Sequence, residues 1–326
     1  MKIVIAHSRP VPPRHYGGTE RVADWLCQGL IELGHEVLLL APAGSKPRKG
    51  VRWIALESRL PWHEEVLSKT PEDADVFHSM VPLSETVENR FHVPTVTTIH
   101  GNGKPHERFS PWAIFVSDDH AKRHGRRAYV HNGVDPAEFP TVLKTERERR
   151  GLVFLAKTSW KVKNLRGAAS LARQAGVGLS IGGGQLPLRE RLEAALRPGW
   201  KWWGPVAGDR KARLLGSGKA MIFPVLWDEP FGLVVIESLL SGTPVLATPR
   251  GSLPELIDSR VGRLIPWEEP VSWIERIREL ESGHLRFDPE CCRQLALDRF
   301  HYRKMAESYL TWYRRRLAGG RWDEQV

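Results

Sequence analysis

The chain has 326 residues, of which 41% are hydrophobic and 26% charged, so it is too apolar to be disordered and long enough for two globular domains. Lysine and arginine outnumber aspartate and glutamate by 48 − 38 = 10, which favours anionic ligands. Three cysteines, two of them adjacent, imply no disulfide framework and fit a reducing cytoplasm. Because no stretch resembles a signal peptide or a membrane span, we expect a protein that is soluble or at most bound to a surface.

Apolar runs that are each too short for a helix recur through the first 135 residues. After the first run, a loop rich in proline and glycine leads into a helix with Val22, Leu26 and Leu30 at helical spacing, which Gly34 ends. The runs themselves are typical of buried parallel strands. We predict strands at residues 2–6, 37–40, 76–80, 95–99, 114–116 and 128–130.

The polar segment Pro136–Arg150 interrupts this pattern, which then restarts. Strands that alternate with helices predict a second doubly wound parallel sheet. A last helix carries Tyr302, Met305, Tyr309 and Trp312 at helical spacing and ends in a cluster of arginines. Before it, we predict strands at residues 152–155, 178–181, 220–223, 244–247 and 262–265, and helices at 164–174, 188–196, 209–215 and 231–241.

The segment Trp227–Glu237 carries the most informative chemical pattern. Two carboxylates, Glu229 and Glu237, lie eight positions apart around Phe231 and Gly232, between a predicted strand and a predicted helix. Backbone amides at a helix start point toward ligands, and carboxylates accept hydrogen bonds from sugar and ribose hydroxyls. The structural alternative is that Glu229 complements the dipole of the helix and that Glu237 is an ordinary helical glutamate.

Residues 227–257 resemble the donor-site signature of retaining GT-B glycosyltransferases, in particular glycosyltransferase family 4. The E-x7-E spacing of the signature matches without a gap. Three further segments extend the resemblance over most of the chain: YGGTE at Tyr16–Glu20, TIHG at Thr98–Gly101 and HNGVD at His131–Asp135.

The resemblance implies an α/β fold of the GT-B type, with two Rossmann-like doubly wound domains facing a central cleft. Residues 1–138 would form the acceptor-side domain and residues 139–300 the domain that binds a nucleotide sugar. The terminal helix, at about residues 301–326, would cross back to the N-terminal domain. The implied reaction transfers a hexose, with retention of configuration, to a hydroxyl of a cell-envelope glycan, a glycolipid or a small metabolite. A UDP-sugar donor is favoured over a GDP-sugar.

Carried onto this sequence, the resemblance assigns Glu237 to the ribose hydroxyls and Glu229 to the donor hexose. The amides after Phe231 would contact the sugar and the diphosphate, and the glycine pair before the first helix would face the reaction centre. The implied donor-binding residues are Gly17, Gly18, Gly183, Phe231, Gly232, Leu233 and Glu237.

The family usually holds the diphosphate with an arginine and a lysine, where this chain reads LAKTSWKVKN. Lys157 takes the arginine position and Lys163 the lysine position, with Lys161 as a competitor; a lysine supplies charge without the guanidinium fork. The implied catalytic residues are His100, Glu229, Lys157 and Lys163, which would position the reactants and stabilise the leaving diphosphate in a front-face displacement. An exposed lysine loop and a histidine that caps its strand are the structural alternatives.

We expect no metal and no other cofactor. The DxD sequence at Asp73–Asp75 precedes a predicted strand, at the amino end, and is interpreted as a solvated turn. The histidines lack the pairing four residues apart, with a third ligand, that a zinc site requires.

Positive charge gathers at His120–Arg127, Ser45–Lys49 and Tyr313–Arg316. Such patches would suit peripheral contact of a cytoplasmic enzyme with the anionic inner face of the membrane. They would also suit nucleic acid, but no helix-turn-helix, zinc-finger or RNA-recognition signature accompanies them, so we expect no nucleic-acid partner. Two alternatives are a non-catalytic or nucleic-acid-binding protein on the same scaffold and a nucleotide-sugar epimerase, against which the glutamate pair argues.

Overall fold

A computed structural model describes residues 1–13, 17–57, 60–104, 107–139, 144–145, 148–186, 188–319 and 322. The chain divides into two compact units. Unit 1 comprises Met1–Asp135 and Phe300–Val326, and unit 2 comprises Pro136–Arg299. From the sequence, the domain boundaries were predicted after residue 138 and after residue 300. In the structure they fall after residues 135 and 299.

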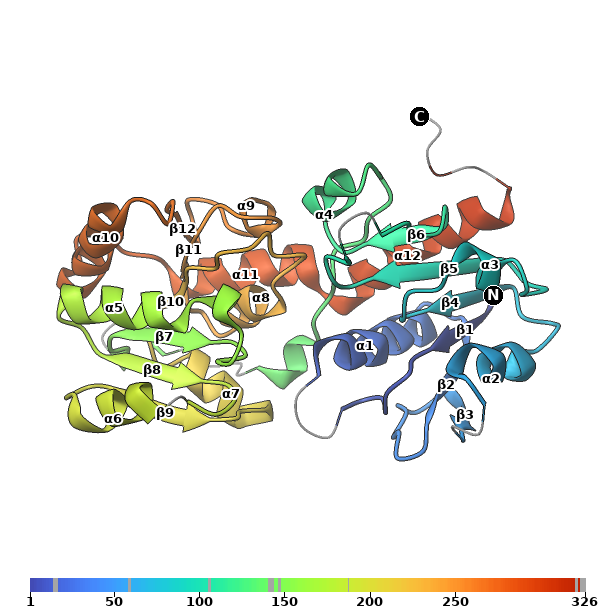
Figure 1. Cartoon of the computed structure of the whole chain (residues 1–326), viewed down its shortest axis with the longest axis horizontal. Helices are drawn as coiled ribbons and strands as arrows, with labels where there is room; N and C mark the ends of the chain where they lie inside the picture. The colour runs from blue at the N-terminus through green and yellow to red at the C-terminus, as the bar shows by residue number, and fades with distance from the viewer. Residues whose placement is uncertain are drawn as a thin grey trace. The chain divides into compact units, whose positions relative to one another are not determined.

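Unit 1 is built on a six-stranded parallel sheet with the strand order β3-β2-β1-β4-β5-β6 (Figure 1). This is the order of a doubly wound sheet, whose winding reverses between β1 and β4. The strands are β1 (Lys2–Ala6), β2 (Glu36–Pro42), β3 (Arg52–Leu56), β4 (Val76–Ser79), β5 (Thr95–Ile99) and β6 (Ala113–Phe115). The helices are α1 (Gly18–Glu32), α2 (Trp62–Lys69), α3 (Glu85–Glu88), α4 (Asp118–Arg123) and α12 (Tyr302–Leu317).

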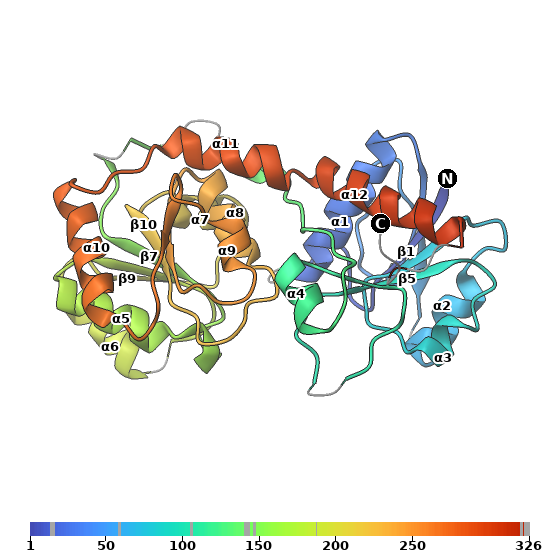
Figure 2. The ribbon, with the colours of Figure 1, turned by 90° about the horizontal axis from the view of Figure 1, so that it is seen from above.

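Helices cover both faces of this sheet, which is why its central strands are apolar on both sides. Ile3, Val4 and Ile5 of β1 are all fully buried. On one face, Val4 packs in a cluster with Phe77 of β4 and Val66 of α2. On the other face, α1 and α12 lie side by side (Figure 2).

The C-terminal helix α12 returns to unit 1, as predicted. It crosses α1 so closely that a Cβ on Gly29 would lie 2.7 Å from the Cβ of Ala306. Since no real side chain tolerates that contact, the glycine sets how near the two helices approach.

The predicted apolar stripe of α12 is correct at Tyr302, Met305 and Tyr309, which are buried, and wrong at its last position. Tyr313 is fully buried there, whereas Trp312 is only partly buried and donates Nε1–H to the Tyr129 carbonyl at 3.2 Å. The buried stripe continues four residues beyond Tyr309 rather than three, since both spacings fit one helix face.

A buried polar chain fastens α12 to the sheet. His78 of β4 contacts the Tyr313 hydroxyl through Nδ1 at 2.6 Å and the Thr98 hydroxyl through Nε2 at 2.7 Å. Thr98 in turn bonds the Tyr309 hydroxyl at 2.9 Å. Burial disfavours the imidazolium and lowers the pKa of His78 to about 3, so the chain is built on a neutral ring.

We expect the buried hydrogen bonds of His78 to make unit 1 less stable in acid. Because the pKa of His78 falls from 6.5 to about 3 on folding, the unfolded chain binds more protons between those values, and stability is lost as the pH falls through this window. The loss should reach about 2 kcal/mol between about pH 6.5 and pH 5. Urea unfolding of the wild type and of His78→Asn measures it: the variant should be less stable near neutrality but lose less on acidification, and equal losses would contradict the assignment.

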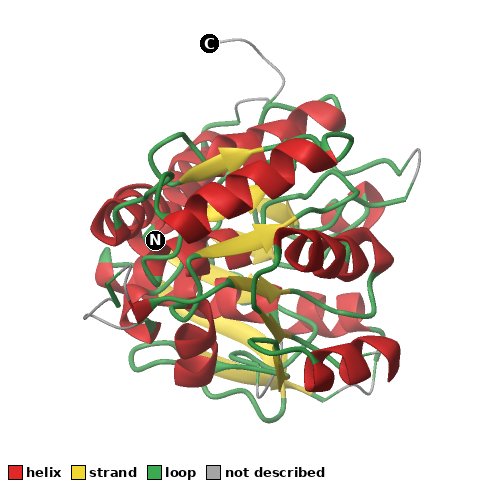
Figure 3. Ribbon diagram, turned by 90° about the vertical axis from the view of Figure 1, so that its left-hand side faces the viewer, coloured by secondary structure: helices red, strands yellow, loops and turns green. Residues whose placement is uncertain are grey.

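Unit 2 repeats the architecture with the order β12-β11-β10-β7-β8-β9, whose winding reverses between β7 and β10 (Figure 1). Helices flank the strands (Figure 3). The strands are β7 (Leu152–Leu155), β8 (Leu179–Gly182), β9 (Lys201–Gly204), β10 (Ala220–Phe223), β11 (Val245–Ala247) and β12 (Gly262–Leu264). The helices are α5 (Leu165–Ala175), α6 (Leu188–Leu196), α7 (Gly208–Leu215), α8 (Leu233–Leu240), α9 (Leu253–Leu256), α10 (Pro270–Ser282) and α11 (Pro289–Phe300), with short 3-10 turns at Pro136–Glu138 and Lys161–Lys163.

The predicted pair of doubly wound sheets is confirmed, with three strand errors. Residues 128–130 form no sheet strand; only an isolated bridge joins Tyr129 to Phe115. The edge strands β3 and β9 were not predicted, because β3 begins with exposed Arg52 and β9 begins with exposed Lys201, so neither reads as a buried run. None of the helices in the described ranges is long and apolar enough to span a membrane.

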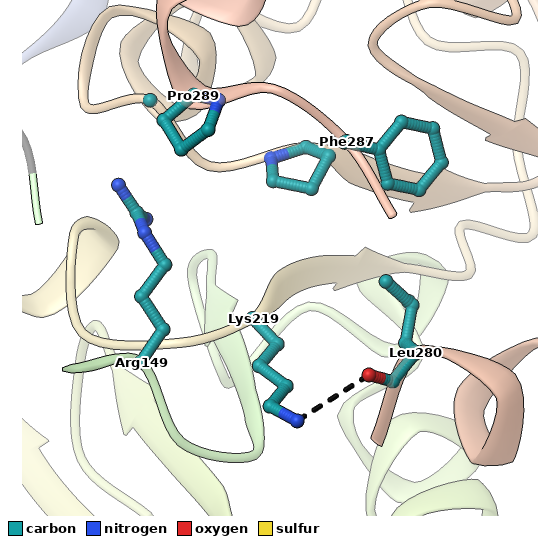
Figure 4. A pocket seen from close by; sticks show the side chains of 7 residues that line it. Arg149, Lys219, Leu280, Phe287 and Pro289 are labelled. Carbon is teal, nitrogen blue, oxygen red and sulfur yellow. Dashed lines mark hydrogen bonds between the residues drawn. The ribbon is translucent and has the colours of Figure 1, made fainter. Parts of the chain in front are cut away.

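A small cavity lies at the amino ends of the strands of unit 2 (Figure 4). The buried Arg149 donates to the carbonyls of Ser241 at 3.0 Å and Lys144 at 3.1 Å, and burial lowers its pKa. Lys219 donates to the carbonyls of Glu281 and Leu280 at 2.7 and 3.3 Å. Because backbone carbonyls accept hydrogen bonds from both cations, we interpret Arg149 and Lys219 as structural residues and assign no ligand to the cavity.

Candidate functional site

The loops that follow β7 and β10 lie where the winding of unit 2 reverses. Ligands of doubly wound sheets bind outside the carboxyl ends of the strands at this switch point. Residues 156–164 form the first loop and residues 224–232 the second. A backbone hydrogen bond from the amide of Leu226 to the carbonyl of Val162, 2.8 Å long, joins them.

An ion pair between Lys163 and Glu229 bridges the two loops. Lys163 Nζ lies 2.5 Å from Glu229 Oε2, and the side chains are only 11% and 9% exposed. The same carboxylate oxygen accepts the Trp227 Nε1–H at 2.8 Å, and the Lys163 ammonium lies 4.8 Å from the centre of the Trp227 ring. Within the described part of the chain, no donor contacts Glu229 Oε1, so that oxygen can serve a ligand.

Asn164 positions the lysine of this pair. Its backbone is left-handed, with φ 56°, which ends the Lys161–Lys163 turn and begins α5. Its Oδ1 caps α5 by accepting from the amide of Gly167 at 3.1 Å, and its Nδ2 donates to the Pro224 carbonyl at 2.9 Å. One side chain therefore fixes both loops.

The turn after β11 clamps the backbone of the glutamate. Gly251 has φ +60°, and a Cβ there would lie 2.4 Å from both the nitrogen and the carbonyl oxygen of Glu229. Next to it, Ser252 donates its amide to the Glu229 carbonyl at 3.0 Å and its hydroxyl to the Phe231 carbonyl at 2.6 Å. The position of the carboxylate thus depends on a glycine distant in sequence.

We expect Gly251→Ala to displace this loop. The substitution adds a backbone clash to the strain of a left-handed alanine, so unit 2 should lose about 3 kcal/mol or more of stability. Gly176→Ala is the matched control, because Gly176 has φ +76° but nothing within 4 Å of an added Cβ, and it should cost about 1 kcal/mol. Urea unfolding measures both, and equal costs would show that the contact with Glu229 is unimportant.

Glu237 of α8 forms the second buried ion pair of unit 2. Its Oε1 lies 2.6 Å from Nζ of Lys211 on α7, and the side chains are 6% and 9% exposed. The Lys211 ammonium also lies 5.6 Å from the centre of the Phe139 ring. Sequence reasoning missed Lys211, because a lysine in the charged stretch GDRKAR looks like part of a solvated helix face.

The start of α8 lies between the two glutamates. The helix begins at Leu233, two residues later than predicted, because Gly232 with φ 93° is its N-cap and Phe231 belongs to the loop. The N-cap residue is a glycine and so has no side chain with which to cap the helix. The backbone therefore presents its amino-terminal dipole beside the Glu229 loop, as the predicted roles of Phe231, Gly232 and Leu233 require.

The other predicted residues of unit 2 flank the first loop. Lys157 is exposed, with Nζ 4.9 Å from the centre of the Trp160 ring, and Lys161 is exposed as well. Gly183 follows β8 with φ 98°, and a Cβ there would lie 2.0 Å from the Ala156 carbonyl oxygen. Lys163 is therefore the predicted cation that the structure brings to Glu229, whereas Lys157 is exposed to solvent in the same loop.

The end of β1 and the start of α1 form a polar chain in unit 1. His7 Nδ1 accepts from the amide of Arg9 at 2.9 Å, so the neutral ring carries its proton on Nε2, which lies 3.3 Å from the Thr19 hydroxyl. Thr19 donates to Glu20 Oε2 at 3.0 Å. Burial lowers the pKa of His7. Sequence reasoning missed this chain, although His7 directly follows a buried strand.

The predicted glycine pair stands beside this chain. Gly17 is the N-cap of α1, where an added Cβ would lie 2.6 Å from Glu20 Oε2, and Gly18 is the first residue of the helix rather than a residue before it. Tyr16, at the start of the same motif, lies outside the described residues.

His100 follows β5 in unit 1. Burial, with smaller contributions from His7 and His120, lowers its pKa to about 3, so the ring is neutral near pH 7. Its Nε2 is buried, and in the ranges that the structure describes it has no hydrogen-bond partner. A buried polar atom without a partner marks a place where a ligand can supply one.

The DxD sequence lies at the amino end of β4. Asp73 pairs with the Lys2 ammonium, and Asp75 accepts from the Lys2 amide at 2.6 Å. Across the described residues, no three histidine, cysteine or acidic side chains gather closely enough to hold a metal ion.

The two sheets define the fold class as that of the GT-B glycosyltransferases, each unit being Rossmann-like. AviGT4, a glycosyltransferase involved in avilamycin A biosynthesis, superposes with a TM-score of 0.79 at 26% identity over 99% of both chains. HepE from Anabaena, solved in complex with UDP and glucose, gives a TM-score of 0.73 at 17% identity over 95% of this chain and 98% of its own.

Residues 149–282 match the family described as Glycosyl transferases group 1, a stretch that includes both ion pairs. A phosphatidyl-myo-inositol mannosyltransferase from Mycolicibacterium smegmatis is 26% identical over 82% of this chain and 81% of its own length. Other curated relatives are matched over much less of their length: 26% for an uncharacterised protein of Klebsiella pneumoniae and 17% for a D-inositol 3-phosphate glycosyltransferase of Streptomyces coelicolor.

Proposed function

We propose that this chain is a retaining glycosyltransferase that moves a hexose from a nucleotide diphosphate sugar, with a UDP-sugar favoured, to a hydroxyl acceptor. The observation that carries the proposal is the Lys163–Glu229 pair, which lies at the switch point of unit 2 within the match to the group 1 family. Carboxylate and ammonium are the groups that a sugar diphosphate needs, the first for hydroxyls and the second for phosphate.

The two sides of the pair would take different parts of the donor. Glu229 offers Oε1 to a sugar hydroxyl while Oε2 stays with Trp227 and Lys163. The Lys163 ammonium has three N–H donors, of which one holds Glu229, so the others can meet the diphosphate. The start of α8 would add backbone amides, and Glu237 would hold the ribose hydroxyls.

His100 would contact the sugar or the diphosphate from unit 1. A neutral imidazole can donate or accept at Nε2, which suits hydroxyls better than a second fixed charge would. In the proposed step the bond from C1 of the hexose to the phosphate oxygen breaks, and the bond from the acceptor oxygen to C1 forms on the same face. The acceptor proton passes to the departing phosphate oxygen, while Lys157 and Lys163 stabilise the charge that develops on the diphosphate.

The acceptor and the metal independence belong to the same proposal. Two relatives bear names of enzymes that act on inositol compounds, so an inositol phosphate joins glycans, glycolipids and small metabolites as a candidate acceptor. Because lysines would neutralise the diphosphate, we propose that turnover needs no metal and withstands a chelator.

A donor panel tests the proposal. Calorimetry with UDP, GDP and ADP identifies the nucleotide, and release of nucleoside diphosphate from UDP-glucose, UDP-galactose, UDP-N-acetylglucosamine and GDP-mannose, each with and without EDTA, identifies the donor. We expect UDP to bind and one donor to turn over with configuration retained. Binding of duplex DNA without any nucleotide binding would replace the proposal with a nucleic-acid-binding function, and isomerised donor in the absence of acceptor would replace it with an epimerase.

A further inference from the structure

The outer surface of α6 in unit 2 has the polarity opposite to that of an ordinary surface helix. Leu188, Leu192 and Leu196 lie four residues apart on one stripe and are 71%, 54% and 80% exposed. The opposite stripe carries Glu190 and Ala194, which are buried against the protein. Since burying leucine stabilises a fold and burying glutamate does not, this orientation is unfavourable for unit 2 alone.

The inward orientation of α6 is held by ion pairs with α5. Arg166 Nε lies 2.9 Å from Glu190 Oε1, and Arg173 Nη1 lies 2.9 Å from Glu193 Oε1. Arg197, at the end of α6, also contacts Glu193 at 2.9 Å. The acids of the helix are thus neutralised on its inner side, and the leucines are left facing outward.

The edge strand β9 continues the exposed apolar surface. Its Trp202 is 36% exposed, and the Arg191 guanidinium of α6 lies 5.4 Å from the centre of that ring, so strand and helix form one surface. Exposed Lys201 lies 4.5 Å from the centre of the Trp203 ring. Of the ten large exposed hydrophobic side chains in the described residues, four lie in this stretch of 15. We call the surface made by Leu188, Leu192, Leu196, Trp202 and Arg191 the leucine–tryptophan face.

Exposed leucines beside a tryptophan that carries an arginine are residues that place a protein at a bilayer interface. Tryptophan rings lie at the headgroup level, apolar chains enter the acyl boundary, and cations meet anionic lipids. A second copy of the chain is the competing occupant of this surface, which the sedimentation velocity experiment below tests. We propose that the leucine–tryptophan face binds peripherally to an anionic membrane surface.

The basic segments of unit 1 are weaker candidates for that contact, because three of their cations form ion pairs within the protein. Lys122 pairs with Asp118 at 2.5 Å and Arg123 with Asp119 at 2.6 Å. Arg48 pairs with Asp24 and Asp135 at 2.7 and 3.0 Å. Among the large exposed leucines of the described residues, Leu317 at the end of α12 directly follows one of these segments.

Co-sedimentation with lipid vesicles tests the proposal. The full chain should bind vesicles of phosphatidylcholine with about 30% phosphatidylglycerol, and bind pure phosphatidylcholine more weakly. Leu192→Glu should lower the partition coefficient about tenfold, and Leu192→Glu/Leu196→Glu should remove binding, because each leucine loses its apolar transfer. Val271→Glu is the matched control: Val271 is 66% exposed on α10, and the change in charge is the same, so binding should stay close to wild type.

A second pair of variants locates the electrostatic contribution. Arg191→Gln should lower affinity for the anionic vesicles about fivefold, whereas Arg127→Gln, which removes the same charge from an exposed position of unit 1, should not. The proposal is overturned if the wild type does not bind anionic vesicles, if only the unit 1 variant loses binding, or if the leucine variants dissociate a dimer in sedimentation velocity runs. UDP calorimetry on the same variants should be unchanged, so failure here leaves the proposed transferase function standing.

Discussion

Glu229→Gln should lower turnover of the donor about 100-fold or more while leaving affinity for UDP nearly unchanged. The amide still accepts Trp227 Nε1–H, but it cannot give a sugar hydroxyl the charge-assisted bond that the carboxylate offers. UDP lacks the hexose, so its binding does not report that contact. Release of UDP from the reactive donor measures turnover, and calorimetry measures UDP binding.

Lys163→Met should act differently on the same two measurements. It removes the charge proposed to meet the diphosphate, so UDP affinity and turnover should both fall, turnover by about 100-fold or more. Lys161→Met is the matched control, because Lys161 is an exposed lysine two positions away in the same loop and should behave like wild type. If Lys161→Met lost UDP binding and Lys163→Met kept it, the assignment of the two lysines would be reversed.

The separate responses would also test how the Lys163–Glu229 contact works. If the pair were only structural, both single variants would lower the stability of unit 2 together and UDP affinity would follow stability. Circular dichroism during urea unfolding supplies that comparison. If Glu229→Gln lowers turnover but keeps its affinity for UDP and its stability, then Glu229 acts on the sugar and is not needed for folding.

The fold could be predicted because buried parallel strands have a distinctive sequence. The runs at 2–6, 95–99, 152–155 and 220–223 match strands β1, β5, β7 and β10 at both ends. The edge strands β3 and β9 mix charged and aromatic residues, since one side of an edge strand meets solvent, and so they give no apolar run. The opposite error at 128–130 arose because a short apolar run can be buried in a loop without joining a sheet.

The candidate site was predicted in its parts but not in its pairings. Glu229 and Glu237 stood out as a pair between a predicted strand and a predicted helix, and the resemblance to family 4 assigned Lys163. Each of these assignments uses only local sequence. That Lys163 meets Glu229 and Lys211 meets Glu237 depends on which strands and helices become neighbours. The same holds for Gly251, whose contact with the Glu229 backbone spans 22 residues of sequence, the difference between 251 and 229.

The Lys211–Glu237 pair offers the sharpest separation of folding from ligand binding. Lys211→Met or Glu237→Met alone should destabilise unit 2 by about 3–5 kcal/mol, because each leaves a buried charge without its partner. Lys211→Met/Glu237→Met should recover most of that stability, since two apolar chains of similar size replace two desolvated charges. Arg276→Met is the control: its partner Glu279 lies on the surface of α10, and the change should cost less than about 1 kcal/mol.

The double variant then decides what Glu237 does. If this glutamate holds the ribose hydroxyls, a stable double variant should still bind UDP at least tenfold more weakly than wild type, because a buried hydroxyl acceptor is missing where the ribose arrives. If calorimetry instead shows wild-type UDP affinity once stability is restored, Glu237 serves only to form the ion pair with Lys211. The nucleotide must then be held by Lys163, by the start of α8 and by groups that neither ion pair includes.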